Sequence, residues 1–246
     1  MGMCAQSKEA MKGPLNPIKI IKALLYKRKF REGHPEYFDP CGTLIFTGAQ
    51  GYGKTLSAVH YVTELAWLYP KSILVTNVDI RSDMFPEGYD IREYHGLDDL
   101  KNVENGYAGV IFFIDEIHLE LNSLESKNID VDIMTEISQQ RKQRKHIVGT
   151  SQVYGRMAKP LREQIKDIVV CKCFFGCIQF NRLIDAFETV EKNGQIHTKT
   201  KKRFLWVHDP SLYGAYDTYA KMRRYKDEWQ GRKQQLPEWM IGGVTS

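Results

Sequence analysis

The sequence lacks any long hydrophobic run: no stretch approaches the roughly 18 consecutive apolar residues that a membrane-spanning helix needs. It also lacks the apolar leader of a signal peptide, an internal repeat and a low-complexity tract. From these absences we expect a globular protein without a transmembrane helix in this chain, one that is peripheral where it meets a membrane.

Cysteines are few and follow no disulfide pattern. Their number is odd, and the five are Cys4, Cys41, Cys171, Cys173 and Cys177. We therefore expect free thiols in a reducing compartment. The last three have the spacing C-x-C-x₃-C, but no C-x₂-C pair or set of histidines completes a tetrahedral metal site. Buried thiols on a core strand are the preferred interpretation.

A strong excess of charge of one sign is also missing. The 246 residues carry 35 Lys and Arg against 30 Asp and Glu, a net charge of +5, which permits an anionic partner without requiring one. Hydrophobic residues make up 42% and charged residues 26%, values close to those of ordinary globular domains, so disordered, collagen-like and coiled-coil classes are excluded.

Three parts are expected along the chain: a basic helical extension with a linker over residues 1–40, a core over 41–177, and a hairpin with a helix over 178–246. The segment 14–31 mixes Ile and Leu with Lys and Arg and predicts a short basic amphipathic helix. Such a helix either packs on the domain behind it or contacts a membrane surface or nucleic acid.

Apolar runs alternate with helical patterns in the core. Strands are expected at 43–47, 73–76, 110–114, 147–150 and 168–175, and helices at 54–68, 129–145 and 161–165. This alternation predicts an α/β fold whose mainly parallel sheet is flanked by helices on both faces. Beyond it, runs at 178–191 and 195–207 around Asn193-Gly194 predict a long β-hairpin, and 215–229 predicts a polar helix.

A glycine-rich segment follows the first apolar strand directly and precedes the first helix. It has the pattern G-x-x-x-x-G-K-T of a phosphate-binding loop, and its residues are Gly48, Ala49, Gln50, Gly51, Tyr52, Gly53, Lys54 and Thr55. Glycines let backbone N–H groups turn toward phosphates, and the helix N-terminus adds positive charge. We expect Lys54 to reach the β- and γ-phosphates of ATP and Thr55 to bind Mg²⁺.

Two carboxylates end the apolar run VIFFI. Asp115 is expected to hold Mg²⁺ directly or through water, and Glu116 to orient and deprotonate a water that attacks the γ-phosphate. A second carboxylate positioned to bind the attacking water is typical of a hydrolase, whereas a small-molecule kinase must exclude water from its site. The pair therefore favours ATP hydrolysis. His118, three residues past Asp115, is interpreted as structural.

A polar amide follows the next strand. Gln152 comes directly after the run HIVGTS, at a position from which it could contact both the γ-phosphate and the attacking water. We therefore predict Gln152 as a sensor of the γ-phosphate.

These segments together resemble the Zot-like ATPases, which include filamentous-phage assembly proteins and zonula occludens toxins, within the FtsK/HerA branch of P-loop ATPases. The likeness covers about residues 44–218 and rests on FTGAQGYGKTLSAV, VTNVDIR with Asn77, FFIDE and LYGAYDT. Arg141 lies eleven residues before Gln152 and Arg162 ten after it, spacings similar to those of the filamentous-phage member.

The resemblance implies a RecA/FtsK-like P-loop NTPase that works as a homo-oligomeric ring. In such rings an arginine of one subunit meets the nucleotide of the next, and Arg141 and Arg162 are the candidates, with Arg144 behind them. The alternative is that this charge run at a helix end only complements the helix dipole.

The function that the resemblance implies is a Mg²⁺-dependent ATPase motor that powers virion assembly and export at the cytoplasmic face of the host or bacterial inner membrane. Partners would be single-stranded DNA, a coat protein, or a membrane-anchored subunit or membrane surface reached through the N-terminal helix. Family members usually continue into a transmembrane helix, whereas this chain ends at Ser246. Two explanations are open: the protein is a relative that reaches the membrane through another subunit or its basic N-terminal helix, or the sequence is a truncated piece.

Two other functions remain open from the sequence. One is an FtsK/HerA-type ATPase that translocates DNA or packages a genome, and the other is a nucleotide-switched scaffold without enzymatic activity. Aromatic residues such as Phe204 and Trp206 beside Lys201, Lys202 and Arg203 either stack bases or pack the hairpin against its surroundings.

Overall fold

The computed structural model describes residues 17–119, 137, 139–140, 142–152, 164–186, 190–192, 195–197 and 199–217. The chain divides into two compact units, Met1–Tyr37 and Phe38–Ser246, and each is described by itself. Among the helices in these described ranges, none combines the length and the hydropathy that crossing a bilayer requires.

The first unit contains the helix α2, Pro17–Gly33, which confirms a helix in the basic segment. The prediction that this helix is amphipathic is wrong, because its apolar and basic residues are spread around the helix and form no separate faces. No residue of α2 is buried, and its apolar residues Ile18, Ile21 and Leu24 are between 55% and 62% exposed. Arg28 and Glu32, one turn apart, form an ion pair at 2.9 Å. The helix therefore presents both its apolar and its basic side chains outward.

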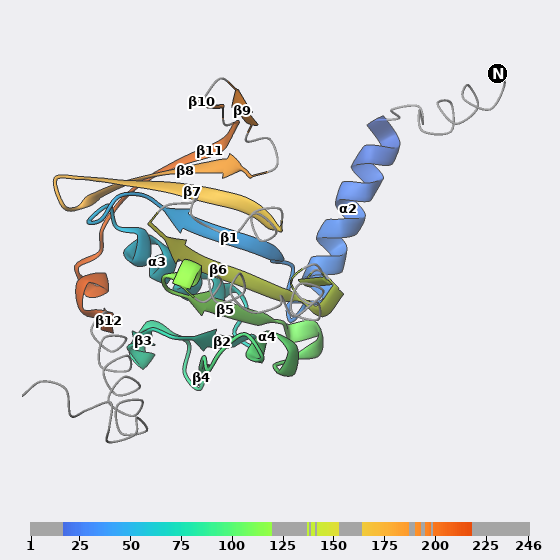
Figure 1. The fold of residues 1–246 in the computed structure, drawn as a ribbon. Helices are drawn as coiled ribbons and strands as arrows, with labels where there is room; N and C mark the ends of the chain where they lie inside the picture. Colours follow the sequence, from blue (N-terminus) through green and yellow to red (C-terminus); the bar gives the residue numbers. More distant parts are fainter. Residues whose placement is uncertain are drawn as a thin grey trace, which may run out of the picture. The chain divides into compact units, whose positions relative to one another are not determined.

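The second unit is built on an eight-stranded sheet with the order β11-β8-β7-β1-β6-β5-β2-β4 (Figure 1). The strands are β1 Gly42–Thr47, β2 Ile73–Thr76, β4 Asp90–Glu93, β5 Val110–Ile114, β6 Lys145–Ser151, β7 Ile165–Phe174, β8 Ile178–Asp185 and β11 Thr200–Val207. From β7 to β4 neighbouring strands are parallel, whereas β8 and β11 pair in antiparallel fashion. The prediction of a mainly parallel α/β sheet of the P-loop NTPase type is confirmed.

Smaller elements complete the unit. They are helices α3 Lys54–Leu68 and α4 Asp99–Asn102, the 3₁₀ turns η1 Ser82–Met84, η2 Gly106–Ala108 and η4 Pro210–Gly214, and the paired short strands β3 Asp79–Ile80 with β12 Tyr216–Asp217 and β9 Val190–Lys192 with β10 Gln195–His197. Strand β9 meets β10 at Lys192 and Gln195, as the predicted hairpin requires, and the turn between them lies outside the described residues.

Several predicted boundaries are wrong. Ile165 begins β7 instead of ending a helix, because it pairs with Thr43 of β1 and is buried to 3% exposure. Lys145 likewise begins β6, and residues 216–217 form β12 where we expected a helix. In each case pairing with a distant strand overrides local helical preference. The remaining residues of the helices predicted over 129–145, 161–165 and 215–229 are largely outside the described ranges.

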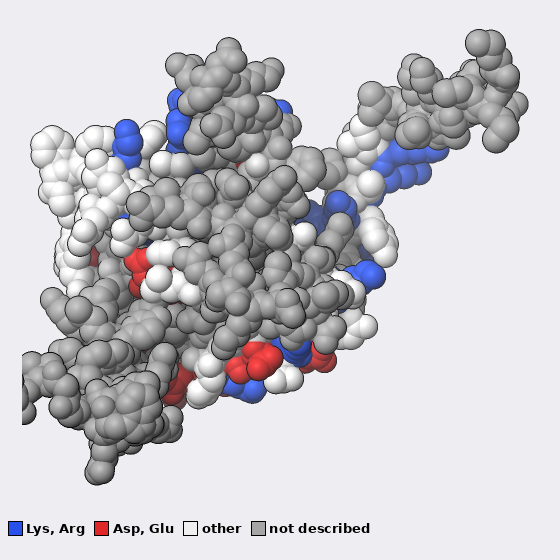
Figure 2. Space-filling view, in the orientation of Figure 1, with Lys and Arg blue, Asp and Glu red and all other residues white. Residues whose placement is uncertain are grey.

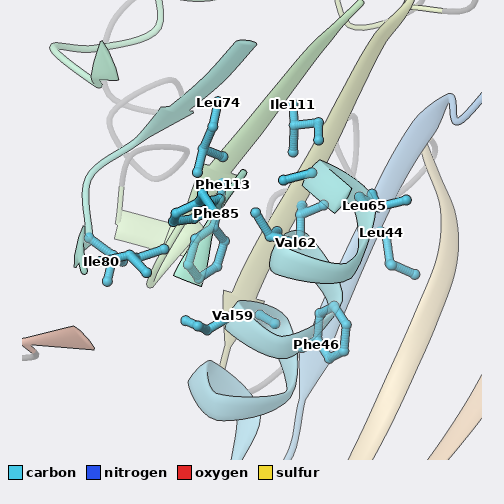
Figure 3. Close-up of a cluster of buried hydrophobic side chains, with 14 of the residues drawn as sticks. Leu44, Phe46, Val59, Val62, Leu65, Leu74, Ile80, Phe85, Ile111 and Phe113 are labelled. Carbon is cyan, nitrogen blue, oxygen red and sulfur yellow. The ribbon is translucent and has the colours of Figure 1, made fainter. Parts of the chain in front are cut away.

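Strand β5 shows why the sheet is buried on both faces. Its run VIFFI has every residue at 0% exposure, with Ile111 and Phe113 toward α3 and Phe112 toward the opposite layer. Figure 3 shows Ile111 and Phe113 packed with Val59 and Val62 of α3. Continuous apolar strands of this kind belong to parallel sheets covered on both sides.

The topology places the candidate chemistry along one edge of the sheet. Strand β6 lies between β1 and β5, so the carboxyl ends of these three parallel strands are neighbours. Gly48, Gln152 and Asp115 follow those three ends directly. Strands β8 and β11 extend the same sheet beyond β7, and the three-part division of the chain stays a prediction.

Candidate functional site

The glycine-rich segment forms a loop between β1 and α3. Tyr52 N donates to Ala49 O at 3.2 Å, and Ser57 N donates to Gly53 O at 2.9 Å, which starts the helix. Gly51 and Gly53 have φ angles of 79° and 71°, in the left-handed region that favours glycine. The segment therefore forms a glycine turn that ends at a helix N-terminus, which is the geometry that phosphate binding requires.

Lys54 lies inside this loop. Its side chain is nearly buried at 8% exposure, and Nζ donates to Ala49 O at 3.1 Å. An ammonium held by one carbonyl has two further N–H donors for phosphate oxygens. The predicted contact of Lys54 with the β- and γ-phosphates is compatible with this geometry.

Three oxygen-bearing side chains meet beside Lys54. Asp115 Oδ1 accepts from Thr55 Oγ1 at 3.0 Å and from Thr150 Oγ1 at 2.6 Å. Carboxylate and hydroxyl oxygens are the hard ligands that Mg²⁺ binds, usually with several waters. Thr55 and Asp115, which the sequence predicts as the metal pair, therefore lie together, and the residues fit the ion.

Asn77 orients Asp115 through two backbone contacts. Its Oδ1 accepts from Asp115 N at 2.8 Å, and its Nδ2 donates to Asp115 O at 3.2 Å. This bidentate contact ties the end of β2 to the end of β5. In the sequence, Asn77 stands out only as part of the segment VTNVDIR that carries the family resemblance, and nothing marks Thr150 as a partner of Asp115.

Glu116 lies next to the predicted metal pair in a left-handed conformation, with φ 52°. Its N–H donates to Thr150 Oγ1 at 2.9 Å, which holds the backbone in this conformation. Gln152 Nε2 lies 3.5 Å from Glu116 Oε1, and His118 Nδ1 lies 3.3 Å from Glu116 Oε2. The structure thus brings Glu116 and Gln152 together and also places His118 against the same carboxylate.

Of the three predicted arginines, the structure describes Arg144. Arg141 and Arg162 lie outside the described residues. Arg144 precedes β6 at the opposite edge of the sheet from the loop, and its Nη1 donates to Phe38 O at 2.9 Å. Partial burial lowers the pKa of the Arg144 guanidinium below its usual range. The roles of Arg141 and Arg162 stay predictions.

A buried polar network from β8 supports the loop from the side of β7. Gln179 is fully buried, its Nε2 donates to Tyr52 O at 3.1 Å, and its Oε1 lies 3.1 Å from His208 Nε2. Desolvation lowers the pKa of His208, which favours the neutral ring. The sequence did not predict Gln179, because a glutamine in a strand that alternates apolar and polar residues gives no sign of its partner.

The cysteines of β7 lie beside the loop as thiols. Cys171 is fully buried, and its carbonyl would contact a Cβ at Gly48 at 2.8 Å. Burial raises the pKa of the Cys171 thiol to about 12, so it is neutral and unreactive. Among the residues that the structure describes, no group of three or more His, Cys, Asp or Glu is arranged to hold a metal ion.

Gly53 offers a test of the support from β8. A Cβ added there would collide with Gln179 Oε1, and φ is 71°. Gly88 has the same φ of 71° with open space around it, so it is a matched control. Gly88→Ala should cost about 1 kcal/mol through backbone strain alone, whereas Gly53→Ala should cost about 2–4 kcal/mol. Urea unfolding measures both, and equal losses would show that Gln179 does not pack against the loop.

A cavity of about 730 Å³ lies away from the loop, along the side of α3 that faces β7, β8 and β11. Its lining includes Leu44, Phe46 and Trp206 together with His60 and Tyr61 of α3. It has none of the backbone N–H turn that phosphate needs. The glycine-rich residues that we expect to bind phosphate are not among its lining residues.

Comparison with known proteins gives no match among protein-family models or curated proteins. Similar solved structures include the N-terminal domain of zonular occludens toxin from Neisseria meningitidis, with 16% identity, a TM-score of 0.47, and coverage of 72% of this chain and 100% of that chain. The DNA-packaging ATPase B204 of Sulfolobus turreted icosahedral virus has 10% identity, a TM-score of 0.46, and coverage of 70% and 98%.

The ATPase DotB of Legionella pneumophila is similar at 10% identity and a TM-score of 0.39, with 61% of this chain and 47% of that chain covered. At such identities and TM-scores these likenesses say nothing about activity. The fold assignment stands on the strand order, the parallel pairing and the loop geometry of the chain itself.

Proposed function

We propose that this chain is a Mg²⁺-dependent ATP hydrolase. The observation that carries the proposal is the contact between Thr55 and Asp115 at 3.0 Å, beside Lys54 and the glycine-rich turn. It joins the phosphate loop to the acidic strand across 60 residues of sequence. When bound, the ion would neutralise negative charge on the β- and γ-phosphates. Glu116 would orient and deprotonate the attacking water, and Gln152 beside it would contact that water and the γ-phosphate.

The coarser role that fits this site is an ATPase motor that works as a homo-oligomer. Its support is the residue-level resemblance to ring-forming ATPases over residues 44–218. Arg141 and Arg162 are our candidates for a residue that reaches a neighbouring subunit's nucleotide. A single such arginine stabilises charge in the transition state and is worth about 10³–10⁵ in rate in related chemistry.

The finer role that we propose is virion assembly and export at a membrane, with α2 as the contact to the lipid surface. Figure 2 shows Lys and Arg side chains along α2, and Leu24 and Leu25 are 61% and 59% exposed. Basic side chains of this kind are attracted to the surface of an anionic bilayer, and the exposed leucines beside them can enter its interface.

A second candidate is a DNA-translocating or genome-packaging motor. The observation that favours it is the exposed edge strand β11, where Lys202 lies 4.8 Å from the ring of Phe204 and Arg203 is exposed. Lys201, by contrast, is held by Asp167 and Asp185, each at 2.7 Å. The basic and aromatic surface available to nucleic acid is therefore smaller than the sequence suggested.

Hydrolysis measured with added vesicles or DNA separates the two roles. We expect anionic vesicles to stimulate hydrolysis severalfold, and Leu24→Glu to weaken vesicle binding in a flotation assay by about tenfold, since each buried CH₂ contributes about 0.8 kcal/mol. Leu205→Glu is the matched control, because Leu205 is a leucine of β11 at 71% exposure. Strong stimulation by duplex DNA with none by vesicles would favour the packaging motor and contradict the export role.

A further inference from the structure

The turn between β7 and β8 exposes two aromatic side chains. Phe174 is 49% exposed and Phe175 is 93% exposed. Phe175 also has a φ of 53°, a left-handed conformation that glycine would adopt without strain. An exposed, strained phenylalanine serves no packing purpose within the described unit. We therefore expect Phe175 to contact a ligand or partner that binds at this turn.

The register of the sheet places the turn beside the phosphate loop. Thr47, the last residue of β1, pairs with Val170, while β7 continues to Phe174. Further along β7, Cys173 pairs with Gln179, whose side chain donates to Tyr52 O in the loop at 3.1 Å. Of this hairpin, residues 174–177 extend beyond the pair Cys173 and Gln179, by roughly 3–7 Å at about 3.3 Å per residue.

Figure 1 shows the same relation, with the turn between β7 and β8 projecting past the carboxyl end of β1. Tyr213 lies behind the turn: its hydroxyl donates to Gly176 O at 3.1 Å and lies 3.0 Å from His208 Nδ1. These two contacts tie the backbone of the turn to the network that also holds the loop. The backbone of the turn is thus held in place next to the glycine-rich loop.

The direction of a bound nucleotide follows from the other side of the site. In the proposed site, Thr55, Asp115 and Glu116 would hold the metal and the γ-phosphate near the carboxyl ends of β6 and β5. A phosphate chain that crossed the loop above β1 would place the α-phosphate and the nucleoside on the opposite side. Strands β7 and β8 form that side, and Phe175 is the large apolar group that stands there.

We propose that the turn 174–177 is the nucleobase subsite, with the ring of Phe175 stacking on the base and Tyr213 as a positioning residue for the turn. The inference rests on the proposed nucleotide binding and deepens it. Stacking on one ring face tolerates every base and is stronger for larger ring systems. ATP and GTP should therefore bind within about threefold of each other, and CTP more weakly than both.

Binding of Mg-ATP and of inorganic tripolyphosphate, which has no base, tests the subsite directly. Loss of one aromatic–base stack typically weakens binding by about 5–150-fold. Phe175→Ala should raise the Kd for Mg-ATP by about tenfold and leave the Kd for tripolyphosphate unchanged. Phe175→Trp keeps the stack and should restore the wild-type Kd for ATP. Since Phe175 is 93% exposed, neither change removes core packing.

Tyr107→Ala is the matched control, because Tyr107 is an aromatic at 75% exposure in η2, just before β5, at the opposite edge of the sheet. It should change neither Kd. Unchanged ATP binding in Phe175→Ala would overturn the base subsite, and so would equal weakening of ATP and tripolyphosphate, which would mean that the turn shapes the phosphate loop. A wild-type chain that binds neither ligand would overturn the proposed function itself.

Discussion

Glu116→Gln should lower kcat by about 10²–10⁴-fold and leave the Kd for Mg-ATP within about twofold of the wild-type value. Glutamine keeps the size and the hydrogen-bonding shape of the side chain but cannot accept a proton from water. The backbone N–H of residue 116 would still donate to Thr150, so the left-handed backbone and the neighbouring Asp115 would be kept. Single-turnover phosphate release and equilibrium binding measure the two quantities separately.

Glu104→Gln is the matched control, since Glu104 is an exposed glutamate before η2, at the opposite edge of the sheet, and its replacement should change neither quantity. Equal hydrolysis by Glu116→Gln and wild type would contradict the proposed base. If the wild-type chain bound Mg-ATP and did not hydrolyse it, the nucleotide-switched scaffold would replace the enzyme.

The parts of the site that the sequence predicted are those where local pattern and function coincide. The segment from Gly48 to Thr55 carries its own turn chemistry, and the apolar run VIFFI is followed directly by Asp115, so the strand and the position of its carboxylate are both visible in the sequence. Helix α3 begins and ends at the predicted residues. The glycine before Lys54 marks its start, and the end of its apolar pattern at Leu68 marks its end. Such features can be predicted from one short segment, without knowing which distant segments pack against it.

The parts that the sequence missed depend on which strands become neighbours. Thr150 acts through Asp115 only because β6 lies beside β5, and Gln179 supports Tyr52 only because β8 extends the sheet next to β7. Strand β4 was missed for a related reason. Its sequence DIRE contains one apolar residue, Ile91, and its pairing with β2 as an edge strand supplies what hydrophobicity does not.

Lys54→Ala should lower kcat/KM for ATP by about 10³-fold and raise the Kd for Mg-ATP by about 10–100-fold. Removing charge-assisted hydrogen bonds to phosphate costs about 1.5–3 kcal/mol in binding, and a lysine that also meets charge developing in the transition state is worth more. The free chain already holds Nζ inside the loop on Ala49 O, so binding does not have to order this side chain. Calorimetric titration and steady-state hydrolysis measure both effects.

Two further substitutions separate the loss of charge from the loss of packing. Lys54→Met keeps the aliphatic stem in the buried position at 8% exposure and should show nearly the full loss of ATP binding with little change in the free energy of unfolding. Lys145→Met removes another buried lysine, whose Nζ donates to Leu100 O at 2.7 Å at the far edge of the sheet, and should lower stability while leaving the Kd unchanged. If Lys54→Met bound ATP like the wild type, the ammonium would have no part in phosphate binding, and the loop would bind through its backbone N–H groups alone.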